Sequence, residues 1–171
     1  RELGEQLLDL AQREQDPALL VEAYRAMGST LFHLGEFTSA RAHLEQGITL
    51  YDSQRHHSHV FLYSREPGVF GLSYAAWLLW HLGYPDQALQ RSAKALTLAQ
   101  QLSYPFSLAA ALGFAAMSHQ LRRERALTQE WAEAGITLAR ELWLLGPEVF
   151  EPWHVVALAE RGAFELEREA R

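Results

Sequence analysis

The sequence lacks cysteine altogether, which excludes disulfide bonds, thiolate metal sites and a cysteine nucleophile. Lysine is nearly absent as well, because Lys94 is the only one among 15 basic residues. With 21 acidic residues the formal net charge is −6, which disfavours a general role in binding nucleic acid. The lack of cysteine is compatible with a reducing compartment, and we expect a cytoplasmic location.

Long apolar runs and the usual catalytic motifs are missing too. The most apolar stretch, Phe106–Met117, is shorter than the roughly 20 residues that a membrane-spanning helix needs, so we expect no membrane partner. The sequence has no glycine-rich loop followed by Lys and Ser/Thr, and no serine in the context of a nucleophile elbow. We therefore expect a chain that is not an enzyme and that takes no cofactor.

What the sequence does contain is an internal repeat. Four similar hexapeptides begin at Leu7, Gly47, Ala95 and Gly135, and their starts lie 40, 48 and 40 residues apart. A proline precedes each apolar helical stretch, at Pro17, Pro67, Pro105 and Pro147. Proline is well suited to the first turn of a helix, where its missing N–H costs nothing. The two markers share a period near 40 residues, which is typical of a helical-repeat protein.

Each period holds two helical stretches joined by a short turn. The apolar spacing predicts full pairs over residues 17–51, 67–102 and 105–142, with partial pairs over 1–12 and 147–171. The expected fold is therefore all-α, a right-handed superhelix that forms a single solenoid. Because the sequence begins at Arg1 without an initiator methionine and ends within a helical pattern, we interpret it as a piece of a longer protein whose cut ends could self-associate.

Small residues recur where the helices of a pair are expected to cross closely. In the three full pairs they are Gly28, Ala40, Gly47, Ala76, Ala88, Ala95, Ala116, Thr128 and Gly135.

This pattern resembles the tetratricopeptide repeat. The first full pair carries Tyr24, Met27-Gly28, Leu31, Gly35, Ala40, Leu44 and Gly47 at the spacing of that motif. The period of about 40 exceeds the typical 34 residues, and the third turn reads Arg122-Arg123-Glu124 where the other two contain glycine. The match is therefore to the longer, divergent kind of repeat.

A narrower resemblance rests on the stretches 31–36, 40–47 and 83–89 and on the loop 56–68. They are similar to the helical-repeat tail of large bacterial signalling proteins, in which a class III adenylate or guanylate cyclase or a kinase-like domain precedes an AAA-type ATPase module and the repeats. The resemblance implies a regulatory or scaffold segment that binds a protein, a peptide or neighbouring domains of its own chain. Cyclase or ATPase activity would lie in those other domains.

The long connection 52–66 carries His56, His57 and His59, which are candidate zinc or nickel ligands. The alternative is a polar loop whose histidines only donate and accept hydrogen bonds, and we expect no metal there because a fourth ligand is not evident. The same loop carries the aromatic residues Phe61 and Tyr63. They either fold back onto the helices or line a binding site.

The inner groove is the second candidate site, since the first helix of each pair lines the concave surface in tetratricopeptide solenoids. Carried over to this chain, the groove residues are Arg25, Ser29, Phe32, His33, Phe70, Ser73, Trp77, Trp80, His81, Gly113, Met117 and Gln120. Aromatic residues and arginine in a groove are typical of interaction hot spots. The competing interpretation is that the tryptophans fill gaps between helices.

Two functions follow from these patterns. The first is a protein-interaction, scaffold or regulatory module. The second is a small-molecule sensor with a pocket around Trp77, Trp80, His81 and Tyr63, capped by the loop 52–66.

Overall fold

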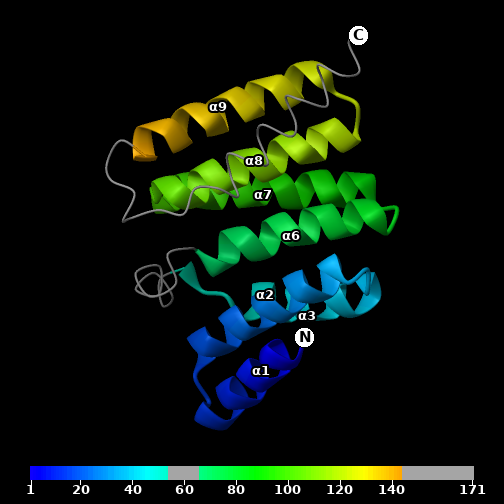
Figure 1. The fold of residues 1–171 in the computed structure, drawn as a ribbon, viewed down its shortest axis with the longest axis vertical. Coiled ribbons are helices and arrows are strands. Elements are labelled where there is room, and N and C mark those ends of the chain that lie inside the picture. The colour runs from blue at the N-terminus through cyan, green and yellow to red at the C-terminus, as the bar shows by residue number, and fades with distance from the viewer. Residues whose placement is uncertain (54–65, 144–171) are drawn as a thin grey trace. The chain divides into compact units, whose positions relative to one another are not determined.

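The computed structural model describes residues 1–53 and 66–143, and all of their regular structure is helical. The seven helices of these residues are shown in Figure 1: α1 (Glu2–Glu14), α2 (Pro17–His33), α3 (Phe37–Leu50), α6 (Pro67–His81), α7 (Pro85–Leu102), α8 (Pro105–Leu121) and α9 (Arg125–Trp143). The expected all-α class is confirmed. Within the described ranges, none of these helices is both long and apolar enough to cross a membrane. The predicted partial pair 147–171 lies outside the described residues.

The prolines mark helix starts as predicted. Pro17, Pro67 and Pro105 each occupy the first turn of a helix. The start of α2 is also capped, because the Asp16 carboxylate accepts hydrogen bonds from the backbone N–H groups of Ala18 at 2.9 Å and Leu19 at 3.3 Å. These bonds satisfy donors that have no partner inside the helix.

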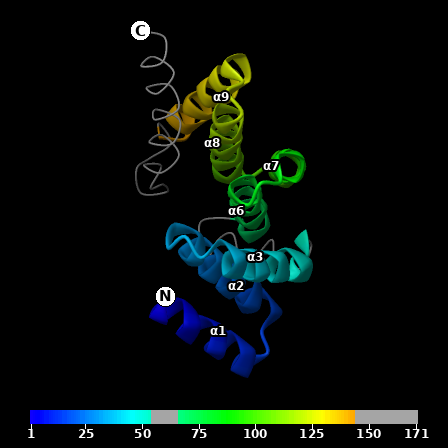
Figure 2. The same cartoon turned by 90° about the vertical axis from the view of Figure 1, so that its right-hand side faces the viewer.

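Contacts divide the chain into two compact units, Arg1–Arg91 and Ser92–Arg171. In the first unit α2 packs against α1, α3 and α6, and α3 also packs against α6 (Figure 2). Its core contains Met27, Leu31, Ala40, Leu44, Ala75 and Leu78, all at most 5% exposed. In the described part of the second unit α8 packs against α9, and Ala116 and Ala132 form a small core with Trp131 and Ile136.

Glycine allows the helices of the α2–α3 and α8–α9 pairs to approach closely. A Cβ atom at Gly28 would lie 2.5 Å from Cγ of Leu44, so α2 and α3 could not keep their separation with any larger residue there. Gly47 faces Tyr24 of α2, and Gly135 of α9 faces Leu112 of α8. All nine predicted small residues are buried, which is the environment expected at helix crossings.

The three turns within pairs share one backbone conformation. In each turn, one residue with positive φ follows the helix: Gly35 at 77°, Gly83 at 83° and Arg123 at 60°. The same two backbone hydrogen bonds close each turn. In the first they run from the N–H groups of Gly35 and Glu36 to the carbonyls of Phe32 and Leu31, as in a Schellman motif. The third turn thus adopts the glycine conformation with an arginine.

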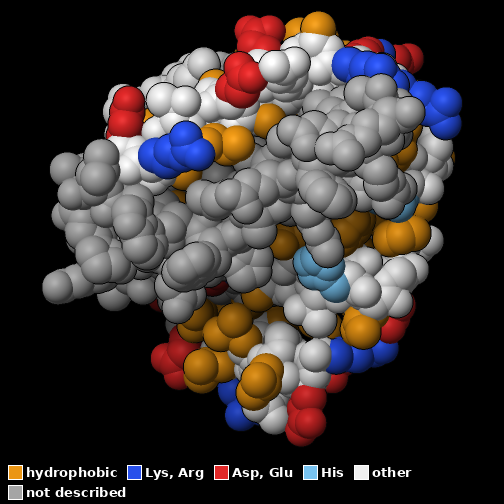
Figure 3. All heavy atoms as spheres, turned by 45° about the horizontal axis from the view of Figure 1, so that its top comes forward, with side chains coloured by type: hydrophobic (Ala, Val, Ile, Leu, Met, Phe, Trp, Pro, Cys, Tyr) orange, Lys and Arg blue, Asp and Glu red, His pale blue; other side chains and the backbone are white. Residues whose placement is uncertain are grey.

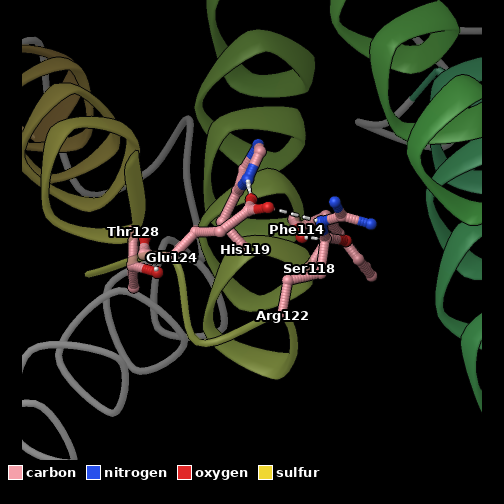
Figure 4. Close-up of polar contacts among 6 residues, drawn as sticks. All are labelled: Phe114, Ser118, His119, Arg122, Glu124 and Thr128. Carbon is pink, nitrogen blue, oxygen red and sulfur yellow. Dashed lines mark hydrogen bonds and ion pairs between the residues drawn. The ribbon is translucent and has the colours of Figure 1, made fainter. Parts of the chain in front are cut away.

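A network of side chains surrounds that third turn (Figure 4). The Glu124 carboxylate accepts a hydrogen bond from Nδ1 of His119 at 2.6 Å and one from Nε of Arg122 at 2.8 Å. The Glu124 carbonyl accepts a third from the hydroxyl of Thr128. The hydrogen bond from His119, followed by that from Arg122, lowers the pKa of Glu124 below its ordinary value. Glu124 therefore stays ionised and connects the end of α8 to the start of α9.

Candidate interaction site

Phe32 is the centre of an aromatic cluster in the first unit. The centroid of its ring lies 5.5 Å from that of His33, 5.7 Å from Phe37, 6.0 Å from Tyr74, 6.1 Å from Trp77 and 5.5 Å from His81. Several of these pairs are edge-to-face, which is a favourable geometry for aromatic rings. We call these six residues the Phe32 cluster.

Three helices bring the cluster together. Phe32 lies in the last turn of α2, and the tight turn at Gly35 places Phe37 at the start of α3 beside it. Tyr74, Trp77 and His81 follow one another at three- and four-residue steps along α6, so they share one face of that helix. The packing of α6 against α2 and α3 then brings this face to Phe32.

The cluster is partly open to solvent. Trp77 is only 7% exposed and serves as its base, whereas Phe32, Phe37 and Tyr74 are half-buried and His33 and His81 are exposed. A surface of aromatic rings edged by imidazoles offers apolar contact area together with polar groups that fix orientation.

The two imidazoles differ in how they are held. Nδ1 of His81 lies 2.8 Å from the carbonyl oxygen of Trp77. Because a carbonyl only accepts, Nδ1 carries the proton, and in the neutral ring Nε2 is the acceptor. Nε2 of His33 lies 3.4 Å from the Tyr74 hydroxyl, a longer contact. The edge of the cluster therefore presents an imidazole whose orientation is fixed by its own helix.

Two predicted groove residues lie inside the fold. Arg25 is 8% exposed, and its Nε donates to Oε2 of the equally buried Glu22 at 2.8 Å. Ser73 is 1% exposed and donates to the carbonyl of Val69 at 2.8 Å. Their polar groups are occupied by partners on their own helices, so neither contributes to the open part of the cluster.

The remaining predicted residues are spread more widely. Ser29 donates to the carbonyl of Ala26, and Phe70 and Trp80 are half-buried on α6. Gly113 is buried and Met117 and Gln120 are half-buried on α8, in the second unit. The histidines His56, His57 and His59 lie outside the described residues, as do Phe61 and Tyr63. Among the residues that are described, no three His, Cys, Asp or Glu side chains are placed to hold a metal ion.

Sequence reasoning missed Phe37 and Tyr74. A signal for Tyr74 exists, because it precedes Trp77 by three residues and His81 by seven and so belongs to the same helical face. For Phe37 the only signal is its position two residues after Gly35, which reverses the chain. Its contacts depend on the packing of three helices.

Several charged side chains of the first unit are held in ion pairs or over an aromatic ring. Arg1 forms an ion pair with Glu36 at 2.9 Å, and Arg91 forms one with Glu45 at 2.7 Å. The guanidinium of Arg41 lies over the exposed ring of Tyr84, 5.3 Å from its centroid. On the face that Figure 3 shows, acidic and basic side chains of the described residues lie interspersed.

The chain was compared with models of known protein families and with curated proteins, and neither comparison gives a match.

Proposed function

We propose that this chain is a non-catalytic helical-repeat module that binds a peptide segment of a protein partner at the Phe32 cluster. The observation that carries the proposal is the combination of three half-buried rings, a buried tryptophan base and two exposed histidines on adjoining helices. Aromatic side chains dominate interaction hot spots because they offer a large rigid contact area. An aliphatic or aromatic anchor from the partner would lie on the rings, and its backbone would hydrogen-bond with the imidazoles.

The resemblance to bacterial signalling proteins supports a more specific proposal. In that setting the module would be a cytoplasmic regulatory or scaffold segment of a larger ATPase or nucleotide cyclase. The bound segment would come from a partner protein or from a neighbouring domain. Deleting the module from such a protein should then change its activity or its set of partners.

The docking surface can be tested with a displayed library of random peptides. Peptides selected on the native chain are measured by titration against the native chain and against a variant with His33→Asp and His81→Asp. Both histidines are exposed, so the variant should keep its circular dichroism spectrum. We expect its affinity for the selected peptides to fall at least about tenfold, equivalent to about 1.4 kcal/mol.

A matched control carries Gln12→Asp and Gln101→Asp, two exposed positions outside the cluster that add the same number of negative charges. It should bind like the native chain. Equal affinity of all three proteins would place peptide binding elsewhere. A library that yields no binder, together with small molecules that raise the melting temperature, would favour the alternative of small-molecule sensing.

A further inference from the structure

The two histidines at the edge of the Phe32 cluster occupy the same position of the repeat. His33 is the last residue of α2 and His81 is the last residue of α6, and Leu and Gly follow each of them. Leu121 stands at the corresponding end of α8. Both imidazoles are exposed. Of the three described pairs, the two that contribute to the cluster therefore have an ionisable side chain at this position.

The hydrogen bonds of His81 decide where its ring can take up a second proton. Nδ1 already carries one proton, which it donates to the carbonyl of Trp77 at 2.8 Å. Nε2 forms no hydrogen bond with any described residue. A second proton therefore goes to Nε2 and changes that atom from a hydrogen-bond acceptor to a charged donor. The ring keeps its place, because the hydrogen bond to Trp77 is present in both states.

His33 and Tyr74 are the ionisable side chains that share ring contacts with His81 in the cluster. The rings of His33 and His81 both lie 5.5 Å from that of Phe32. Nε2 of His33 lies 3.4 Å from the Tyr74 hydroxyl, which can donate or accept. An imidazole is either neutral or positive, and a phenol is neutral at ordinary pH. Neither side chain therefore supplies a negative charge to a protonated His81.

The charged groups of the neighbouring helix ends are already engaged or make no contact with His81. Glu36, which directly precedes α3, is paired with Arg1 at 2.9 Å. Arg41 of α3 lies over the ring of the exposed tyrosine in the turn after α6. Asp86, in the first turn of α7, forms no hydrogen bond or ion pair with His81. Within the described part of the chain, a positive charge on His81 would thus lack a carboxylate partner.

We propose that the segment bound at the Phe32 cluster carries an Asp or Glu side chain beside its apolar anchor, and that proton uptake at Nε2 of His81 strengthens its binding. The inference rests on the proposed function, because it specifies the chemistry of the segment that the cluster binds. Charge complementarity supports it, since the edge of the cluster can gain a positive charge while the adjoining Glu36 is already paired. The charge would also lie at the carboxyl end of α6, where the aligned peptide dipoles favour a cation.

The two protonation states of His81 discriminate between segments. In the neutral ring Nε2 is an acceptor, and a carboxylate is an acceptor too, so the two cannot form a hydrogen bond. In the protonated ring Nε2–H, with its proton taken from solvent, donates to the carboxylate in a charge-assisted hydrogen bond. An amide in place of the carboxylate can donate to the neutral ring and accept from the charged one. A segment with Asn or Gln should therefore bind with little dependence on pH.

The proposal can be tested with peptides selected on the native chain from the displayed library. Selection and titration are performed at about pH 5.5 and about pH 8, which bracket the range in which imidazoles change charge while peptide carboxylates stay ionised. We expect selection at the lower pH to enrich Asp or Glu. Each acidic peptide should bind about three- to tenfold more tightly at the lower pH, whereas its Asp→Asn or Glu→Gln form should change by less than about twofold.

Three glutamine variants identify the histidine that titrates. His81→Gln keeps a polar amide but cannot gain a proton, so it should bind acidic peptides with the same affinity at both pH values. His33→Gln should keep the ratio of the two affinities even where it weakens binding. His43→Gln is the matched control outside the cluster and should also keep that ratio. Circular dichroism at both pH values confirms that each variant is folded.

Nuclear magnetic resonance tests the premise without any peptide. The ¹⁵N chemical shifts of the His81 ring at the higher pH should show a proton on Nδ1 and none on Nε2, as the contact with Trp77 requires. The opposite tautomer would overturn the proposal, because Nε2 would then donate in both states.

Failure of this inference and failure of the proposed function give different results. Peptides that bind the His33→Asp and His81→Asp variant more weakly, but bind the native chain equally at both pH values, would keep the docking surface and overturn the proton linkage. A pH dependence that survives in His81→Gln would assign the proton to another group and overturn the role of His81. Peptides that bind the double variant as tightly as the native chain, or a library without binders, would overturn the proposed function and the inference together.

Discussion

Arg123 has the left-handed backbone conformation that glycine has at the equivalent position of the other two turns. Its φ is 60°, close to the values at Gly35 and Gly83, and its exposed side chain forms no hydrogen bond or ion pair among the described residues. A residue with a Cβ pays about 1–2 kcal/mol to stay left-handed. Glycine avoids that cost, but its greater conformational freedom in the unfolded chain lowers the stability of the fold by about 0.4–1 kcal/mol. We therefore expect Arg123→Gly to stabilise the protein by about 0.5–1 kcal/mol.

The assay is urea unfolding followed by circular dichroism, with thermal unfolding as a second measurement. For a chain of this length the gain corresponds to an increase of about 1–4 °C in melting temperature. The reverse change, Gly35→Ala, should destabilise by about 1 kcal/mol for conformational reasons alone, since a Cβ at Gly35 would meet no atom within 4 Å.

A neighbouring control separates conformation from composition. Arg122 has a negative φ of −81°, and its Nε donates to Glu124. Arg122→Gly removes the same side chain from a position that needs no glycine, so it should destabilise. If Arg123→Gly leaves stability unchanged or lowers it, the left-handed strain at this turn is not the dominant contribution, and the reasoning fails.

Three further predictions concern single contacts. Gly28→Ala should destabilise the protein by about 1–3 kcal/mol in urea unfolding, because its Cβ would lie 2.5 Å from Cγ of Leu44 and 3.2 Å from the Leu44 backbone nitrogen. An unchanged midpoint of urea unfolding would mean that α2 and α3 separate freely. The pKa of Glu124 is lowered in the folded state, so its stabilising contribution is present above the ordinary value of 4.5 and is lost as pH falls through the lowered pKa. Glu124→Gln should therefore make the free energy of unfolding less dependent on pH over that acidic range. The same pH dependence of unfolding in both proteins would contradict the network. Burial, followed by the neighbouring Glu66 carboxylate, raises the pKa of the Tyr51 hydroxyl above its ordinary value of 10.0. The folded chain therefore keeps a proton that the unfolded chain loses above that pH. The free energy of unfolding should fall as pH rises past that value, and Tyr51→Phe should remove this part of the decline.

The features that the sequence predicted well are local or periodic. The pairs predicted over residues 17–51, 67–102 and 105–142 begin at Pro17, Pro67 and Pro105, where α2, α6 and α8 begin, since a proline opens each of these helices. The buried small residues followed from the repeat, because equivalent positions meet equivalent neighbours. Such signals depend only on the helical period and on the residues preferred at the ends of helices.

What the sequence left undetermined depends on packing between helices. Helical phase shows that Tyr74, Trp77 and His81 share a face, but it does not show that Phe32 and Phe37 cover that face. The resemblance to tetratricopeptide solenoids also places Arg25 among the groove residues. The structure buries it, because Glu22 lies one helical turn earlier and neutralises its charge.

The third turn shows how one repeat geometry tolerates different residues. In register with the other pairs, His119 stands where the first two have the buried leucines Leu31 and Leu79. An imidazole at that position needs a hydrogen-bond partner, and Glu124 supplies one from the start of α9. The same carboxylate holds Arg122 beside the strained Arg123. One acidic side chain thus provides the partner that an imidazole needs at a leucine position and a contact to the residue before Arg123, while the left-handed conformation of Arg123 itself keeps its cost.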